Sequence, residues 1–455
     1  MAIHPVSSAA DTLHARATRK ALVRLLPIML AAYFMAYIDR TNVALAKTHL
    51  QADVGISVTA FGLGAGIFFV SYAFLEVPSS LIMHRIGPRR WIARIALTWG
   101  ALSAAMMFVQ GEWSFYFLRF FLGMAEAGLY PTLMYMVTVW FSQQHRATVV
   151  GFIYLAPTVA LIVGNPMGGA LMELDSAMGL HGWQWMFLIE GIVTMLVGVL
   201  VWVSLPETPR DAKWLTSEEA EILSARATAG GEQRDSRIKG NLKSAFGRPF
   251  IVIVALIYLF NQITNVGIVF NLPSIVEDLN ISGSFLIGLV SGSSGVGATI
   301  GVLLVPVVHR RFGNEVALIG VLAALTAVLA GAYVVSSSPV MQIVLIAVSM
   351  IFVFGTLPLF WSVAMARMSG LVAAAGLAFI NTIGLLGGFL GPYAFGLAED
   401  ATGNPSAGLW VVIACSVVGV ALTPLLASAV RKEDAAKAEA EAAAVEAETA
   451  ATVSR

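Results

Sequence analysis

Charged residues are scarce in this chain of 455 residues, where they make up 12% of the positions and hydrophobic residues make up 58%. So few charges cannot cover the surface of a water-soluble monomer, which excludes that class of protein. The chain has one cysteine, Cys415, and this excludes a disulfide framework, a cysteine metal cluster and Cys-x-x-Cys chemistry. Strict alternation of apolar and polar residues is also missing, so a membrane β-barrel is not expected.

Apolar runs of about 20 residues, the length of a helix that crosses a bilayer, recur along the whole chain. They predict an all-α integral membrane protein with twelve transmembrane helices. The first run is too long for a cleavable signal peptide and many others follow it, so we expect it to remain in the protein. The predicted spans are residues 22–45, 58–83, 91–110, 113–142, 147–172, 183–205, 250–276, 284–307, 313–335, 340–366, 371–398 and 406–429.

Basic residues are concentrated in every second loop between the predicted spans. The loops on the other side carry mostly acids, and Lys47 is the only base among them. Because positively charged loops stay in the cytoplasm, both termini are predicted to be cytoplasmic, in a multi-pass protein of the bacterial inner membrane. The basic loop residues are Arg16, Arg19, Lys20, Arg24, Arg85, Arg89, Arg90, Arg146, Arg310, Arg311, Arg431 and Lys432.

The two halves of the chain repeat each other on either side of a polar segment. GLYP in the fourth span and GTLP in the tenth lie 227 residues apart. Repeats in the same orientation fit two six-helix bundles related by an axis along the membrane normal, with a substrate site between them. The predicted domains are a cytoplasmic N-terminal segment (1–21), an N-terminal six-helix bundle (22–205), a cytoplasmic central loop (206–249), a C-terminal six-helix bundle (250–429) and a cytoplasmic Ala/Glu-rich tail (430–455).

Four charged side chains inside the predicted spans stand out, because each charge at membrane depth costs on the order of 2.5–3.5 kcal/mol to insert. Asp39 and Arg40 are neighbours in the first span, and neighbours on a helix point about a quarter-turn apart, so they cannot pair well with each other. Arg119 lies at the depth of Asp39 and is its expected partner, which leaves Arg40 for an incoming anion. The alternative is a fixed ion pair that locks the first and fourth spans together.

Glu126 is the fourth of these charged side chains and the expected proton carrier. It follows Arg119 by seven positions, or about 10 Å on the same helix face, and it has no basic neighbour one turn away.

Several longer motifs carry a family resemblance. The motifs are YIDRTNVALA in the first span, FLRFFLGMAEAGLYPTLMYMVTVWF in the fourth, GWQWMFLIEG entering the sixth and LPETPRDAKWLTSEE after it. With twelve spans and a duplication, the chain resembles the major facilitator superfamily, and the motifs resemble its anion:cation symporter family. That family includes permeases for tartrate, glucarate, galactonate, phthalate and hydroxyphenylacetate, and the vesicular glutamate transporters. One departure is the loop after the second span, where Ser80 and His84 replace the glycine and the acid of the pattern G-x-x-x-D-R-x-G.

The resemblance implies roles for individual residues. The acids matching Asp39 and Glu126 are implicated in proton coupling, the arginine matching Arg40 contacts the substrate, and the one matching Arg119 tunes the buried acid.

Tyr72, Trp361 and Asn381 match positions implicated in substrate contact, and Asn261, Asn265 and Ser362 are supporting candidates from the second half. For the asparagines, interhelical hydrogen bonds are the alternative role. Glu190 is a weaker candidate for which a structural role is favoured, and Glu76 is left outside the site because it lies late in its span.

These observations predict a proton-coupled symporter that imports a small organic carboxylate by alternating access. The substrate is a sugar acid, a dicarboxylate or an aromatic acid, and the alternative is an organic-anion exchanger or facilitator without proton coupling. An intramembrane protease is disfavoured because GSSG at 292–295 has only His309, at a loop, as a downstream base. A channel is disfavoured because nothing resembles a selectivity filter. The expected partners are the anion, protons and the bilayer, for a monomer without enzymatic activity, cofactor, metal or nucleic acid.

Overall fold

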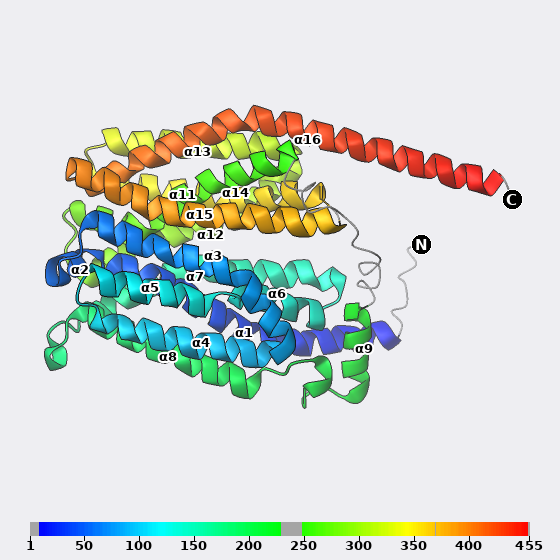
Figure 1. Cartoon of the computed structure of the whole chain (residues 1–455), viewed down its shortest axis with the longest axis horizontal. Helices are drawn as coiled ribbons and strands as arrows, with labels where there is room; N and C mark the ends of the chain where they lie inside the picture. Colours follow the sequence, from blue (N-terminus) through cyan, green and yellow to red (C-terminus); the bar gives the residue numbers. More distant parts are fainter. Residues whose placement is uncertain (1–8, 229–247, 369, 454–455) are drawn as a thin grey trace, which may run out of the picture.

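The computed structural model describes residues 9–228, 248–368 and 370–453, so parts of the predicted segments 1–21, 206–249 and 430–455 lie outside it. Every regular element in these residues is a helix (Figure 1). The longer helices are α1 (Ala9–Leu45), α2 (Lys47–Val54), α3 (Val58–Ile86), α4 (Pro88–Ala105), α5 (Glu112–Glu126), α6 (Leu129–Trp140), α7 (Gln143–Met172), α8 (Gly182–Ser204), α9 (Ser217–Thr228), α11 (Pro249–Asp278), α12 (Ser284–Phe312), α13 (Glu315–Val335), α14 (Pro339–Ala366), α15 (Gly370–Thr402) and α16 (Gly408–Val453).

The predicted membrane helices are present in the described chain. Eleven helices are long and apolar enough to cross a bilayer. The remaining predicted span, residues 113–142, is divided into α5 and α6, of 15 and 12 residues. The prediction of an all-α membrane protein is therefore confirmed, with one span built from two shorter helices.

The division of this span lies directly after Glu126. Gly128 has φ +92°, in the left-handed region that favours glycine, and a Cβ atom there would lie 2.0 Å from Ser79 Oγ. Pro131 has no N–H to donate to the carbonyl of Ala127, four residues earlier. The Ser79 hydroxyl donates to that carbonyl instead, at 2.6 Å. The carbonyl of Ala127 at the break is therefore hydrogen-bonded, and α5 ends at the buried carboxyl group of Glu126.

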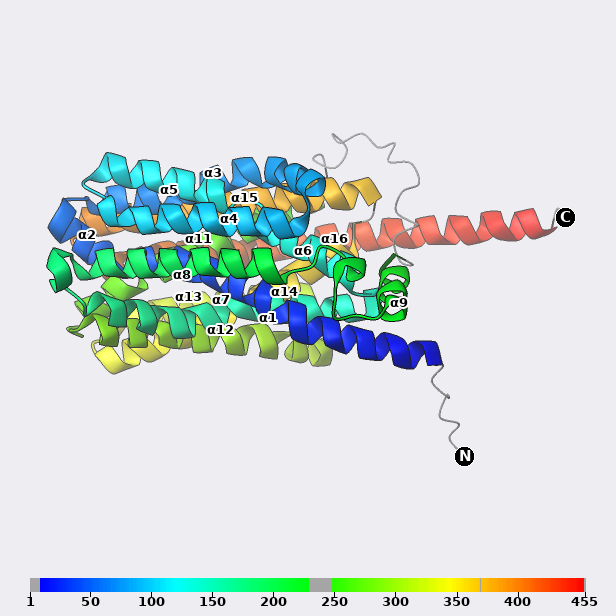
Figure 2. The ribbon, with the colours of Figure 1, turned by 90° about the horizontal axis from the view of Figure 1, so that it is seen from below.

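The helices form two bundles, α1 to α8 and α11 to α16, which occupy different parts of the molecule in Figure 1. The bundles meet along two seams, α3 against α15 and α7 against α12, and Figure 2 shows each pair side by side. Small residues bring the backbones close at both seams. A Cβ atom on Gly66 would lie 2.6 Å from the carbonyl oxygen of Phe389, and one on Gly288 would lie 2.2 Å from that of Asn165.

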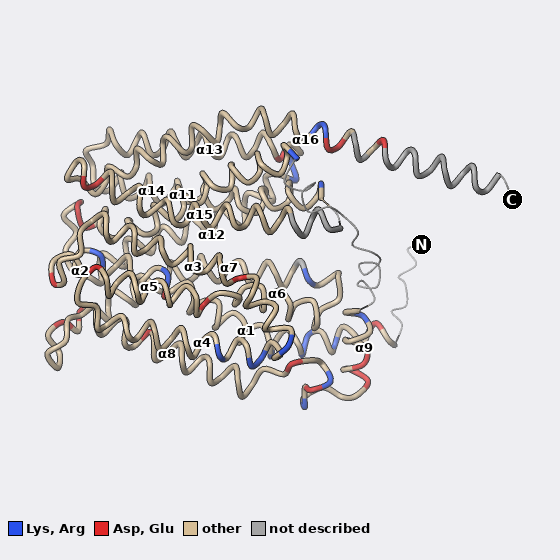
Figure 3. Tube along the Cα trace, in the orientation of Figure 1, with Lys and Arg blue, Asp and Glu red and all other residues tan. Residues whose placement is uncertain are grey.

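The two ends of the molecule differ in charge and in how the bundles are joined. Basic residues gather at the end with α9, where α1 begins, whereas the charged residues at the end with α2 are mostly acidic (Figure 3). Ion pairs at the α9 end join residues of the same half, such as Lys20 with Glu219 and Arg367 with Glu315. At the α2 end, by contrast, polar contacts cross from one bundle to the other.

Lys47 makes the most buried of these crossing contacts. Its Nζ lies 2.5 Å from Glu399 Oε2 on α15 and 2.9 Å from Asn271 Oδ1 on α11, and the residue is 0% exposed. Burial lowers the pKa of Lys47, although the neighbouring Glu399 acts in the opposite direction. Nearby, the backbone N–H of Thr59 donates to Asp400 at 3.1 Å. The bundles are therefore fastened together at the α2 end.

Candidate functional site

All four predicted intramembrane charges lie in the first bundle, on α1 and α5. Asp39, Arg119 and Glu126 are 3%, 1% and 0% exposed. The Arg40 side chain is slightly more accessible, at 14%. Charged groups held this far from water need partners, because an isolated charge in a low-dielectric interior is costly.

Arg40 and Glu126 form an ion pair across the two helices. Arg40 Nη2 lies 2.5 Å and Nε 2.9 Å from the same oxygen, Glu126 Oε1. The second oxygen, Oε2, is buried and has no hydrogen-bond partner. The carboxylate thus occupies two of the five guanidinium donors through a single oxygen.

This pairing corrects the predicted arrangement, in which Asp39 paired with Arg119 and Arg40 stayed unpaired. Side chains on an α-helix lean towards its N-terminus. α1 begins at the α9 end, so the long Arg40 side chain leans deeper into the molecule, where α5 ends at Glu126. The predicted depths were estimated from the rise per residue along each helix, which locates the backbone only. The direction in which the Arg40 side chain extends towards α5 was therefore not predicted.

Asp39 has a neutral partner in place of the predicted ion pair. It accepts a hydrogen bond from the Ser103 hydroxyl on α4, and its Oδ2 is buried without a partner. Arg119 acts on it electrostatically, from beyond ion-pair distance. The Arg119 guanidinium donates to the carbonyl of Ala65 at 3.3 Å and lies 4.8 Å from the ring centre of Phe68.

Aromatic rings surround the Arg40 guanidinium. Its carbon lies 5.1 Å from the ring centres of both Tyr37 and Tyr72, and 5.5 Å from that of Phe68. Such distances allow cation–π attraction, which offsets part of the cost of holding the cation away from water. Of the predicted substrate contacts, Tyr72 is therefore brought next to Arg40.

The other predicted substrate contacts lie on the second bundle. Asn381 Nδ2 on α15 donates to Glu76 Oε2 on α3 at 3.0 Å, across the seam between the bundles. Glu76 is half-buried here, whereas the sequence analysis left it outside the site. Trp361 packs edge-to-face against Tyr258, with ring centres 5.4 Å apart. The Tyr258 ring in turn packs on α15 at Gly384, one turn after Asn381, where a Cβ atom would lie 2.1 Å from the ring, so Trp361 and Asn381 belong to one region.

The supporting candidates are not brought together with Arg40. Asn261 donates to the carbonyl of Val353 at 3.3 Å, an interhelical bond of the kind expected as its alternative role. Asn265 donates to Gln262 on its own helix at 3.5 Å. Ser362 is exposed and donates to Glu315 at 3.3 Å.

Sequence reasoning missed several polar groups. Tyr130 and Tyr154 share a hydrogen bond of 2.9 Å between their hydroxyls. Asn42 was also missed, although it lies one helical turn after Asp39. Its Nδ2 donates to Glu190 Oε2 at 2.7 Å. The i, i+3 spacing from Asp39 was the available signal for Asn42, whereas the tyrosines had none beyond their place in apolar spans.

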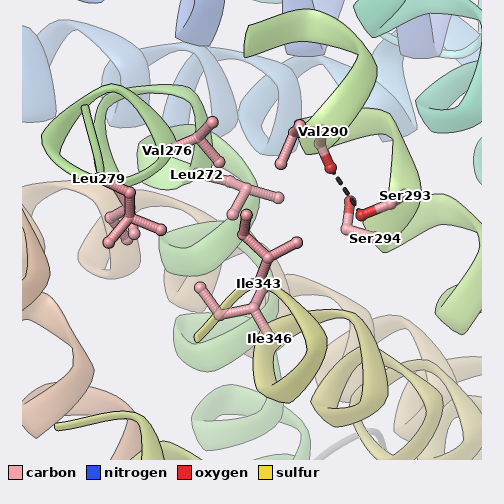
Figure 4. Close-up of a pocket in the computed structure, with 9 residues that line it drawn as sticks. Leu272, Val276, Leu279, Val290, Ser293, Ser294, Ile343 and Ile346 are labelled. Carbon is pink, nitrogen blue, oxygen red and sulfur yellow. Dashed lines mark hydrogen bonds between the residues drawn. The ribbon is translucent and has the colours of Figure 1, made fainter. Parts of the chain in front are cut away.

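A small pocket elsewhere does not compete with this site. Figure 4 shows it among Leu272, Val276, Val290, Ile343 and Ile346, inside the second bundle. Its lining is apolar apart from two serine hydroxyls that donate to backbone carbonyls. Such a lining offers no charge to hold an anion. No group of three or more metal-ligating side chains occurs among the described residues.

Comparisons with known proteins agree with this architecture. The sequence model described as Major Facilitator Superfamily matches residues 29–392. A quinolone resistance transporter of Acinetobacter baumannii is 35% identical over 405 residues, covering 89% of this chain and 93% of that protein. A putative tartrate transporter of Agrobacterium vitis is 37% identical over 419 residues, 92% of each chain. A bacterial homologue of the human lysosomal transporter Spinster, solved in an inward-facing and unoccupied conformation, aligns with a TM-score of 0.73 at 18% identity, over 91% of this chain and 98% of that one.

Proposed function

The chain belongs to the major facilitator superfamily, and we propose that it is a proton-coupled symporter that imports a small organic carboxylate. The observation that carries the proposal is the buried ion pair between Arg40 and Glu126. A guanidinium is the side chain best suited to grip a carboxylate, and here its partner is itself a carboxylate that can bind a proton. The tartrate named for one relative is a carboxylate of this class.

Coupling follows from competition for Arg40. While Glu126 is ionised, it holds two of the guanidinium donors through Oε1. A proton on Glu126 removes its charge and weakens that hold, so Arg40 becomes free to bind the substrate carboxylate. Proton and substrate therefore bind together, and loss of the proton returns Glu126 to Arg40 and expels the anion.

Alternating access accounts for the different ends of the molecule. The crossing contacts of Lys47 close the α2 end, and the basic loops favour a cytoplasmic position for the α9 end and both termini. In this orientation the structure represents a carrier that is closed to the outside. The buried Tyr72 and the half-buried Trp361 and Asn381 then form part of the substrate's surroundings near Arg40.

The proposed function predicts carboxylate uptake that depends on a proton gradient. Purified protein in proteoliposomes is expected to accumulate one of a panel of sugar acids, dicarboxylates and aromatic acids when the outside is acidic. A protonophore should abolish accumulation but leave counterflow of the same acid intact. Counterflow without any accumulation driven by the proton gradient would instead indicate an exchanger or facilitator without proton coupling. No counterflow of any of these acids would contradict carboxylate transport itself.

Arg40→Lys is expected to weaken substrate binding by about tenfold or more, equivalent to at least about 1.4 kcal/mol. Lysine keeps the charge but cannot offer two parallel hydrogen bonds to a carboxylate, and it lacks the planar face that stacks on Tyr37 and Tyr72. Affinity is measured as the half-saturating substrate concentration in counterflow. Arg89→Lys, near the protein surface, is the matched control and should bind normally. Unchanged affinity in Arg40→Lys would remove Arg40 from the substrate site.

A further inference from the structure

Glu190 on α8 is a buried carboxyl group that the coupling scheme above does not use. The residue is 2% exposed, and its only hydrogen bond in the described structure is the one from Asn42. Its second oxygen, Oε1, is buried without a partner. A lone ionised carboxylate so far from water is strongly unfavourable, whereas a protonated one is not.

Among the described residues, no cation compensates Glu190 from the helices that pack most on α8, which are α1, α4, α7 and the short helix at residues 106–108. From α1 come Asn42 and the acid Asp39, which interacts with Glu190 electrostatically. From α7 comes Gly168, where a Cβ atom would lie 3.5 Å from Glu190 Oε1. α4 contributes the Ser103 hydroxyl that is bound to Asp39. The charged group that faces Glu190 is therefore another acid.

The charges of the first bundle's interior lead to the same conclusion. Three buried carboxyl groups, those of Asp39, Glu126 and Glu190, accompany two guanidinium groups. The other buried cation of this bundle, Lys47, is engaged by Glu399 of the second bundle. Arg40 is engaged by Glu126, and Arg119 acts on Asp39 and Glu126. The buried carboxyl groups therefore outnumber the available cations by one. Glu190 is the carboxyl group that has no cationic neighbour.

We propose that Glu190 is an additional proton-binding site of the carrier, occupied in the state described here and linked to Asp39. The inference rests on the proposed proton coupling and deepens it. Because Glu190 and Asp39 repel when both are ionised, a proton lost from one strengthens proton binding at the other, and the two titrate as a pair. Asn42 holds this pair together, since it lies one turn from Asp39 and binds Glu190.

Two measurements on the full-length protein test the inference. Infrared difference spectroscopy across a pH titration is expected to show a protonated-carboxyl band that disappears in Glu190→Gln and persists in the control Glu221→Gln, on the exposed face of α9. In proteoliposomes, Glu190→Gln should retain counterflow but move one proton fewer per substrate than the wild type. An unchanged band, or an unchanged number of protons, overturns the inference.

A second variant, Asn42→Leu, tests the same site if Glu190→Gln folds poorly. Asn42→Leu removes the N–H donor that favours the ionised carboxyl group, so the pH midpoint of transport should move to higher pH while counterflow persists. A midpoint equal to that of the wild type contradicts the proposed site. A failure of the proposed function gives a different result from a failure of the Glu190 site. If the function is wrong, the wild type itself moves no protons with substrate, and this result overturns both the proposed function and the Glu190 site.

Discussion

Glu126→Gln is expected to abolish proton-driven accumulation of substrate while leaving counterflow intact. Glutamine matches the protonated carboxyl group in shape and neutrality, so the loaded carrier still forms and crosses. The empty carrier can no longer restore the ion pair between position 126 and Arg40 that completes its cycle, so a proton bound at Glu190 cannot drive net uptake by itself. Substrate should therefore only exchange, at a concentration ratio of about one. Because the ionised competitor for Arg40 is gone, substrate affinity should also depend less on pH than in the wild type.

Uptake against a gradient, counterflow and substrate-induced alkalinisation outside measure these effects separately. Glu221→Gln, exposed on α9, is the matched control and should resemble the wild type in all three. Glu126→Gln also leaves Arg40 without its partner, which costs on the order of 3–5 kcal/mol in a buried site, so the folded fraction is checked by thermal unfolding. Normal accumulation with normal pH dependence would place coupling elsewhere, with Asp39 the next candidate. Loss of counterflow and binding as well would make Glu126 a structural or substrate-contacting residue.

The fold was largely predictable because a bilayer imposes a length and an apolar composition on each helix. These are properties of single segments, and all twelve predicted spans have counterparts among the described helices. The division of the fourth span was harder to anticipate. Gly128 and Pro131 are visible in the sequence, but the hydroxyl that stabilises the break comes from Ser79 on another helix.

The same distinction separates what could be predicted of the site from what could not. Asp39, Arg40, Arg119 and Glu126 stand out because burying a charge is costly, and this cost can be assessed from one span at a time. Their pairing depends on how two helices rotate and lean against each other, so Arg40 with Glu126 was not anticipated. Glu76 was left out for a similar reason, since its partner Asn381 belongs to the other bundle.

The contact of Lys47 with Glu399 carries the second large prediction, because it joins the two bundles and must break whenever the α2 end opens. Both side chains lose water in the closed state, and Asn271 completes the set of partners. Removing one member of a buried ion pair leaves an uncompensated charge, at a cost of about 3–5 kcal/mol. In an open α2 end the same charge would be hydrated, so the cost falls mainly on the closed state.

Lys47→Met and Glu399→Gln are therefore each expected to shift the carrier towards conformations open at the α2 end, by roughly 100-fold or more in the equilibrium constant. Spin labels at Leu174 and Val340, exposed in different halves, report the change as a longer distance, after Cys415 is replaced by serine. The charge swap, with Glu at position 47 and Lys at position 399, should restore most of the closed population, which a general loss of stability would not. Distance distributions that match the wild type in both single variants would show that the pair does not hold the α2 end closed.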